Sequence, residues 1–274
     1  MKKIIIICMM TAITSAVYAL PSDNFDNNSM DPSLWHLYQV DINAWVSETN
    51  QRLELRSTGG GAAIYYAKGW GLSATNDFSF KIDFHFFRPS SGPADTDASV
   101  QFCINNGFSN DVIIEAGCGS TGEGTAYHSF FYSSIENPIE GTEVPKGEKE
   151  RNTDNGTLYI SYDASEDVLY LSDIGYGSEN AWVTIPGLVQ GEWGNNALIP
   201  SFGGWSDGIV LNSGDAYLDN FVVDSGTIVQ ICEYALAGDL NNDCKVNFGD
   251  FAIMAENWLI DCYANPSDPA CVSK

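Results

Sequence analysis

Short runs of alternating apolar and polar residues fill most of the chain. They are rich in β-branched and aromatic side chains and lie at residues 53–57, 78–87, 98–104, 111–116, 156–163 and 167–173. A period of two predicts half-buried strands, and pairs such as Asn106-Gly107 and Asn155-Gly156 between the runs predict turns. No convincing apolar stripe with helical spacing precedes residue 245. We therefore expect an all-β fold, an antiparallel sandwich or barrel, over residues 20–228.

One charged segment interrupts the alternation at residues 141–155. Its sequence, GTEVPKGEKERNTDN, holds almost no large apolar side chain and is bounded by turn residues. This composition is typical of a solvent-exposed connection. We therefore expect a loop in this place.

The two ends of the chain differ from the middle. Residues 1–19 hold two lysines, an apolar run and the small-residue site Val17-Tyr18-Ala19, which together indicate a secretory signal peptide. Residues 229–274 crowd four cysteines into a small module that lacks a large core. We expect a bacterial protein that is secreted or held at the cell surface. After signal cleavage, we find no apolar run long enough to span a membrane.

Acidic residues dominate the charged positions. The chain has 36 Asp and Glu against 12 Lys and Arg, and removal of Lys2 and Lys3 with the signal peptide takes the net charge from −24 to −26. Such a surface repels nucleic acid and anionic lipid, but it suits calcium or a neutral polysaccharide.

The twelve residues from Asp239 to Asp250 have the spacing of a calcium loop. Calcium takes about six to eight oxygen ligands, which such a loop supplies from its first, third, fifth, seventh, ninth and twelfth places. These places are held by Asp239, Asn241, Asp243, Lys245, Asn247 and Asp250. The seventh ligand is a backbone carbonyl, so lysine is acceptable there. We therefore expect this loop to bind calcium.

An apolar stripe follows the loop at Phe248, Phe251, Met254 and Trp258. Steps of three and four residues predict an amphipathic helix. Asp250 would lie in its first turn, where negative charge is favoured.

Six cysteines remain without Cys8 of the signal peptide, and an even number in an oxidising compartment suggests disulfides. Cys103 and Cys118 flank a possible hairpin centred at residues 110–111, where they would face each other. Cys244 stands at the sixth loop place, where a glycine normally allows a positive φ. A disulfide would hold that conformation, and we expect Cys244 to pair with Cys262. Cys232 would then pair with Cys271, although other connectivities are open.

Two stretches carry a family resemblance across residues 23–224. The segment DNFDNNSMDPSLWHLYQVD, followed by WVSETNQRLELRS, resembles the opening of concanavalin A-like lectin/glucanase (LamG-like) domains, and GDAYLDNFVV resembles their closing strand. The resemblance implies an antiparallel jelly-roll β-sandwich with Trp35 in its core. It also implies a second calcium site between Asp219 and an N-terminal aspartate, Asp23 or Asp26.

The tail resembles another family over GDLNNDCKVNFGDFAIMAENWL, which is similar to half of a type I dockerin. Paired dockerin repeats bind cohesin domains in polysaccharide-degrading complexes. This chain has one repeat and carries Phe248-Gly249 in place of the usual Ser/Thr-type recognition pair. Two alternatives therefore stay open for the tail. It binds a cohesin-like or other surface protein, or its apolar face packs on the sandwich.

The sequence lacks the pattern of catalytic carboxylates that such a fold would carry in an enzyme. Glucanases of this superfamily carry Glu-x-Asp-x-x-Glu on one strand, whereas Glu115 lies on a predicted strand without the other two. The three histidines are scattered and have no nucleophile elbow beside them. This favours a protein without catalytic residues.

Exposed aromatic rings would instead bind sugar faces. The candidates are Trp70, Trp182, Trp193 and Trp205, with Tyr65 and Tyr66. We expect a secreted, non-catalytic carbohydrate-binding or attachment protein that acts in polysaccharide recognition or degradation. The alternatives are a diverged glycoside hydrolase of the same superfamily and a structural or adhesive cell-surface protein.

Overall fold

The computed structural model describes residues 20–39, 42–87, 94–106, 111–120, 126–137, 142–194, 196–232, 237–240 and 244–257. The strands in these ranges are β1 (Ser22–Asp23), β2 (Trp35–Gln39), β3 (Ala44–Thr49), β4 (Arg52–Ala67), β5 (Trp70–Leu72), β6 (Phe78–Phe86), β7 (Thr96–Asn105), β8 (Asp111–Ser120), β9 (His128–Asn137), β10 (Thr142–Glu150), β11 (Asn155–Asp163), β12 (Val168–Ser172), β13 (Val183–Pro186), β14 (Ile199–Ser225) and β15 (Ile228–Gln230). The helical segments are η1 (Leu188–Glu192) and α1 (Phe248–Asn257).

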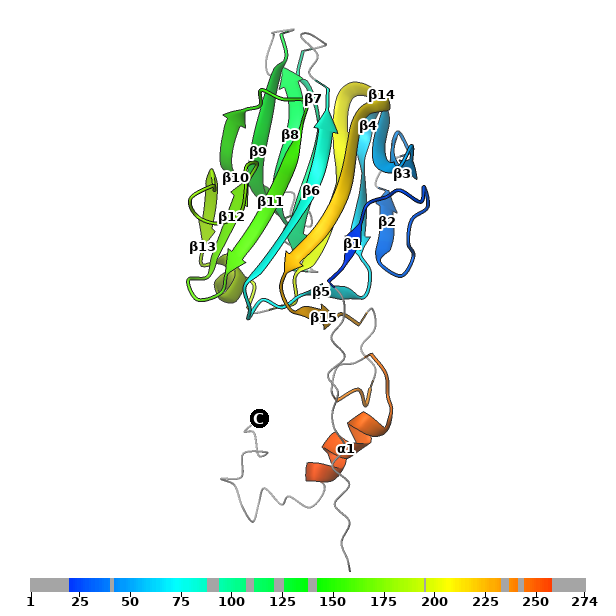
Figure 1. Cartoon of the computed structure of the whole chain (residues 1–274), viewed down its shortest axis with the longest axis vertical. Helices are drawn as coiled ribbons and strands as arrows, with labels where there is room; N and C mark the ends of the chain where they lie inside the picture. The colour runs from blue at the N-terminus through cyan, green and yellow to red at the C-terminus, as the bar shows by residue number, and fades with distance from the viewer. Residues whose placement is uncertain are drawn as a thin grey trace, which may run out of the picture.

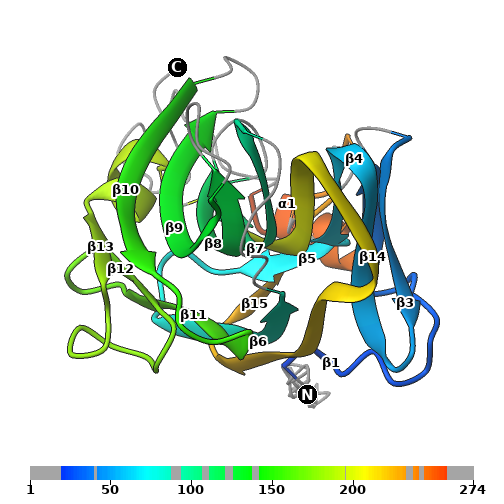
Figure 2. The same cartoon turned by 90° about the horizontal axis from the view of Figure 1, so that it is seen from above.

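Two antiparallel layers pack face to face (Figures 1 and 2). The concave layer has the strand order β10-β9-β8-β7-β14-β4-β2, and the convex layer has the order β3-β4-β14-β6-β11-β12-β13. The long strands β4 and β14 belong to both layers, and β1 pairs with the end of β14. The expected all-β jelly-roll sandwich is confirmed, and each of the six alternating runs falls on a strand.

An aromatic cluster around Trp35 fills the core between the layers. The Trp35 ring lies edge-on to Phe202 and Phe221, at centroid distances of 4.6 and 5.1 Å. Its indole N–H donates to Oδ2 of Asp23 at 2.7 Å, so this buried ring has a partner for its polar atom. The expected core position of Trp35 is confirmed.

The segment predicted as a loop at residues 141–155 is mostly strand, so this prediction was wrong. Residues 142–150 form β10, which pairs with β9 at the edge of the concave layer with a bulge at Pro145. Exposed charged side chains and a proline at a bulge are features of an edge strand, which must not pair with other chains. The charged composition that suggested a loop is therefore that of an edge strand.

Arg151 is a buried cation behind the concave layer, with 1% of its surface exposed. Its guanidinium donates to the backbone carbonyls of Phe86 at 2.9 Å, Thr153 at 2.6 Å and Gly117 at 3.1 Å. These carbonyls belong to β6, β8 and the connection after β10. One side chain therefore satisfies acceptors from both layers.

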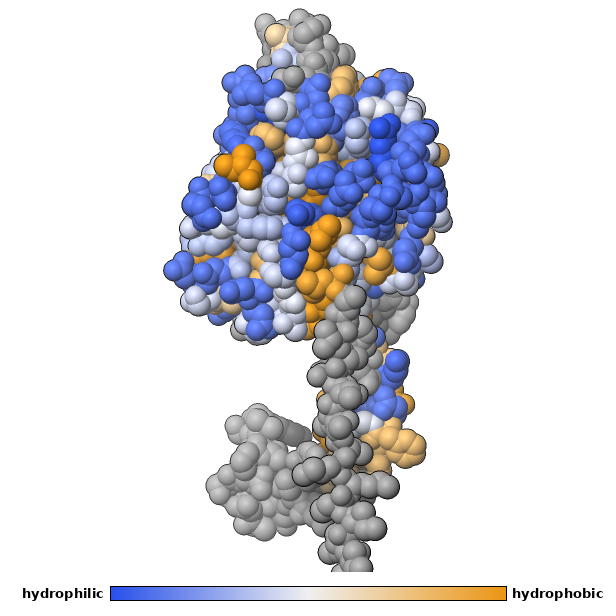
Figure 3. All heavy atoms as spheres, viewed as in Figure 1, coloured by the Kyte–Doolittle hydropathy of each residue, from blue (hydrophilic) through white to orange (hydrophobic). Residues whose placement is uncertain are grey.

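The tail follows β15, which pairs with β5 at one end of the sandwich. Helix α1 confirms the helix predicted after the loop, and Figure 1 shows it apart from the sandwich. Phe248, Phe251 and Met254 are 89%, 56% and 42% exposed, so the described part of this face does not pack on the sandwich. Figure 3 shows a mainly polar face of the sandwich and apolar atoms on the tail below it. Among the residues that the structure describes, no helix combines the length and apolar character needed to cross a membrane.

Candidate functional site

A cleft of about 770 Å³ runs over the concave layer. In Figure 2, β10 and β4 stand at the two sides of this layer, and β7 and β8 lie lower between them. Alternate residues of each strand face outward, so the pairing register decides which side chains meet in the cleft. Glu115 of β8 stands opposite Gln101 of β7 and Tyr132 of β9, in the middle of the floor.

Glu115 is a carboxyl group held below the cleft surface, with 4% of the residue exposed. Its oxygens accept hydrogen bonds from Gln101 Nε2 at 2.6 Å and from Ser99 Oγ at 3.0 Å, and the Trp205 side chain is a further partner. Burial raises the pKa of Glu115 to about 8, although these hydrogen bonds oppose the shift. At neutral pH the group is therefore mostly protonated, as a general acid must be.

Glycines occupy the next outward positions of β8. A Cβ at Gly117 would lie 2.5 Å from the carbonyl oxygen of Ala98, and one at Gly119 would lie 2.6 Å from Cβ of Asp97. Side chains do not fit there unless the neighbouring strand moves. On the C-terminal side of Glu115, β8 therefore carries no second outward carboxylate. This agrees with the missing Glu-x-Asp-x-x-Glu pattern in the sequence.

Three carboxylates stand side by side at one end of the cleft. Asp111 pairs with Glu136 across β8 and β9, and Glu136 pairs with Glu143 across β9 and β10. Burial and the charge of Glu136 raise the pKa of Asp111 to about 6, and burial and the charge of Glu143 raise the pKa of Glu136. The Tyr132 hydroxyl donates to Glu143. We call Asp111, Glu136 and Glu143 the acidic row.

Aromatic residues line the opposite side of the cleft. Tyr38 and Tyr66, on β2 and β4, lie edge to face at 5.9 Å, and Trp205 projects from β14. Tyr38 is 49% exposed. These rings, which we call the aromatic side, offer faces on which a flat apolar ligand surface can stack.

Only one of the four tryptophans proposed from the sequence lines this cleft, namely Trp205. Trp70 and Trp193 are 7% and 1% exposed and belong to the core, so their assignment as sugar-binding residues was wrong. Trp182 packs on the core, with Lys149 over its ring. Glycine and asparagine neighbours suggested loops at Trp193 and Trp205 and did not reveal which face each ring takes.

The sequence analysis missed other side chains of the cleft. They include Tyr38, Gln101, Asp111, Phe130, Tyr132, Glu136 and Glu143. On β9, the outward positions have the same parity as Tyr132, because Tyr132 pairs with Glu115. Counting every second residue from the one that pairs with Glu115 therefore identifies the outward residues. This count requires the pairing register of the strands, which the sequence does not give.

The disulfide expected between Cys103 and Cys118 is wrong, since both cysteines are free and buried. The hairpin pairs Asn105 with Asp111, so Cys103 meets Ile113 and not Cys118. Cys118 lies five positions further, about 17 Å along the strand at about 3.4 Å per residue. An odd shift also reverses the face, so Cys103 lines the cleft and Cys118 lies in the core.

Cys244 forms a disulfide with Cys232, with 5.2 Å between the Cα atoms. Its φ of 64° is the left-handed conformation expected at the sixth loop place, and the expected disulfide at this residue is present. The partner was wrong, as was the pairing of Cys232 with Cys271. The sixth place turns back to the chain that enters the loop, so Cys232 lies within bridging distance. Cys262, Cys271 and Trp258 lie outside the described residues.

The described ends of the tail loop hold two of the predicted carboxylate ligands in place. Asp239 Oδ2 accepts the N–H of Cys244 at 2.8 Å, and Asp250 accepts the N–H groups of Leu240 and Asn247, each at 2.7 Å. Both carboxylates are thus oriented into the loop, and Asp250 is 2% exposed. Asn241 and Asp243 lie outside the described residues. Calcium binding by Asp239, Lys245, Asn247 and Asp250 with these two stays a prediction.

Calcium affinity tests the assignment of this loop directly. We expect calcium to bind the full chain and the variants Asp239→Asn and Asp250→Asn to weaken that binding at least about tenfold, because each loses a charged ligand. Calorimetric titration with CaCl₂ measures the affinity, and Glu166→Gln on the sandwich is the charge-matched control. Unchanged calcium affinity in both loop variants would contradict the assignment.

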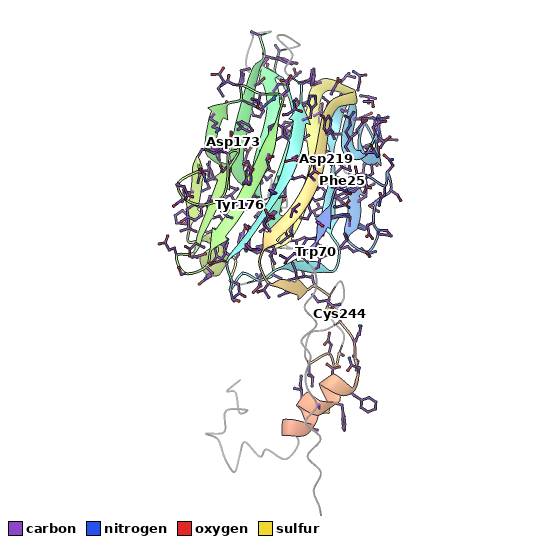
Figure 4. The ribbon with its side chains drawn as sticks, in the orientation of Figure 1. Phe25, Trp70, Asp173, Tyr176, Asp219 and Cys244 are labelled. Atoms are coloured by element: carbon purple, nitrogen blue, oxygen red, sulfur yellow. A yellow bond between two sulfur atoms is a disulfide. The ribbon has the colours of Figure 1, made fainter. Side chains whose placement is uncertain are left out.

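The proposed second calcium site lies on the convex layer. Strand β1 pairs with Phe221 and Val222 of β14, which brings the N-terminal segment next to Asp219 (Figure 4). Burial and the charges of Asp26 and Asp83 raise the pKa of Asp219. Within the described ranges, however, no three acidic, histidine or cysteine side chains have a metal-binding arrangement. A calcium ion at Asp26 and Asp219 stays a prediction.

No protein-family model matches the chain, and no curated protein matches it in sequence. Among solved structures, a glycosyl hydrolase family protein from Mycobacterium fortuitum matches with a TM-score of 0.50 and 12% identity, over 78% of this chain and 100% of its own. An endo-1,3-beta-glucanase from Streptomyces sioyaensis matches with a TM-score of 0.49 and 12% identity, over 77% and 94%. The CBM2 module of the evolved Dit of Lactobacillus casei BL23 phage J-1 has a TM-score of 0.49 and 12% identity, over 79% and 97%. The match at a TM-score of 0.50 shows that the chain shares its β-sandwich fold with the Mycobacterium fortuitum protein.

Proposed function

We propose that this is a secreted protein whose concave cleft binds a polysaccharide, with the tail as a calcium-ordered attachment segment. The observation that carries the proposal is one cleft with aromatic rings on one side and carboxyl and amide groups on its floor. Sugar rings stack their C–H faces on aromatic rings and direct their hydroxyls to polar groups. An open cleft across a whole sheet suits a chain of sugars better than a single small molecule.

Hydrolysis of that polysaccharide is the second candidate function, and Glu115 favours it. A buried carboxyl group that stays protonated at neutral pH, in the floor of a cleft, has the property of a glycosidase acid. The neighbouring strand offers Glu136, four positions beyond the Tyr132 that faces Glu115. That offset is about 13 Å along the strand. This offset exceeds the roughly 6.5–9.5 Å between the carboxyl groups of inverting glycosidases, so the register does not pair Glu136 with Glu115 as base and acid.

The fold does not choose between these candidates, because fold alone does not determine function. A binding protein uses the whole cleft without chemical change, whereas a hydrolase also needs Glu115 to donate a proton. Binding is the step that both require, so it is tested first.

Trp205→Ala is expected to weaken binding of a glycan hexamer about tenfold or more, because a stacking ring contributes about 1–2 kcal/mol. The measurement is calorimetric titration of the full chain with hexamers of β-1,3-linked glucose, β-1,4-linked glucose and β-1,4-linked glucosamine. Phe248→Ala removes an exposed ring from the tail and is the matched control. Loss of binding in Phe248→Ala with unchanged binding in Trp205→Ala would place the ligand on the tail and contradict the proposal.

A further inference from the structure

The acidic row places like charges next to one another, which destabilises the sheet. Asp111, Glu136 and Glu143 occupy directly paired positions on three neighbouring strands. Like charges at such positions destabilise a sheet. The raised pKa values of Asp111 and Glu136 record the same repulsion together with burial. Solubility alone does not require three carboxylates at adjacent positions. Their alignment inside a cleft therefore points to a ligand that compensates their charge.

The cleft itself contains little compensating charge. Among the described residues that line it, none is a lysine or an arginine, and its one histidine, His128, lies 3.6 Å from Glu148 in an ion-pair position. Besides the acidic row, three carboxyl groups line the same cleft, those of Asp97, Glu115 and Glu148. A glycan with carboxylate or sulfate groups would be repelled here, and a neutral glycan would leave the row unpaired.

Aromatic rings stand within reach of the row. Burial and the negative charge of Asp111 both raise the pKa of Tyr66 to about 12, which places the two side chains within electrostatic range. Tyr132 lies on β9 with Glu136, and its hydroxyl donates to Glu143. An ammonium group is attracted both by carboxylates and by ring faces, so this combination of groups selects an organic cation.

We propose that the ligand of the cleft is a polysaccharide with free amino groups, of the glucosamine type. The acidic row binds its ammonium groups, and the aromatic side stacks on its sugar faces. This inference rests on the proposed function, since it names the ligand class of the same cleft. A bare metal ion fits less well, because the described residues contain no three acidic, histidine or cysteine side chains in a metal-binding arrangement.

The test compares three hexamers of equal length on the full chain by calorimetry: β-1,4-linked glucosamine, its N-acetylated form and β-1,4-linked glucose. We expect the glucosamine hexamer to bind at least about tenfold more tightly than the other two, with a preference that falls as salt is raised. Glu136→Gln and Asp111→Asn are expected to remove most of that preference. Both substitutions keep side-chain size and relieve repulsion, so the fold is retained. Glu166→Gln removes one charge outside the cleft and is the control.

The outcomes separate this inference from the proposed function. If the acetylated or glucose hexamer binds as tightly as the glucosamine hexamer, and Trp205→Ala weakens it, the amino-group inference fails and the polysaccharide cleft stands. If the acidic-row variants lose calcium affinity but not the amino preference, the row is a metal site and the inference fails. If none of the hexamers binds, both proposals fail.

Discussion

If the chain hydrolyses the glycan that it binds, Glu115→Gln should lower the rate by about 10²–10⁴-fold, the usual contribution of a general acid. The amide keeps the size of the side chain and its place between Gln101 and Tyr132, but it has no proton to donate. Release of reducing ends from the hexamers that bind is the measurement. The wild-type rate should also fall as pH rises through about 8, because Glu115 then loses its proton.

The pH dependence of unfolding is the control for a folding artefact. The folded state raises the pKa of Glu115 from 4.5 to about 8, so the stability that this group contributes is fully present below pH 4.5 and is lost as pH rises through about 8. The variant does not titrate, so its free energy of unfolding should depend less on pH in that window. An unchanged hydrolysis rate in Glu115→Gln would contradict its role as the acid. A wild type that binds hexamers and cleaves none would leave the binding function alone.

Arg151→Met should lower the free energy of unfolding by about 3–5 kcal/mol, because each buried carbonyl left without a donor costs about 1–3 kcal/mol. The methionine is apolar, so the carbonyls of Gly117, Phe86 and Thr153 lose their donor in a place without access to water. Urea unfolding followed by tryptophan fluorescence measures the change.

Lys81→Met is the matched control, since it also removes one cation. Lys81 is about one-third exposed and lies 3.3 Å from Asp224, so its loss should cost under about 1 kcal/mol. Equal small effects of the two substitutions would show that Arg151 is not the link between layers that its hydrogen bonds indicate.

Local pattern predicted the strands, because alternation is a property of neighbours in sequence. The run at 78–87 alternates apolar and polar residues, and β6 buries every second side chain. The same logic located the tail helix and the unusual conformation of Cys244, since both depend on a few adjacent residues. The edge strand β10 was missed because its charges protect an edge and resemble those of a loop.

The cleft was not predictable in the same way. Glu115 was noticed, yet its neighbours Gln101, Tyr132 and Trp205 come from three other strands. Their meeting depends on register, and a shift of one residue would turn each strand over. The error at Cys103 and Cys118 has this cause, because a hairpin centre misplaced by a few residues separates the two thiols. The Cys232–Cys244 bridge likewise depends on how the loop folds back.

The central claim is that the concave cleft holds the glycan, and the indole resonances of the tryptophans test it most directly. Trp205 lines the cleft, whereas the indole N–H groups of Trp35 and Trp70 donate to Asp23 and to the carbonyl of Leu34 inside the sandwich. Titration of the ¹⁵N-labelled full chain with the tightest-binding hexamer should shift the Trp205 indole signal, assigned with Trp205→Phe, and leave those of Trp35 and Trp70 in place. A saturated complex in which the Trp205 signal does not move would contradict the account.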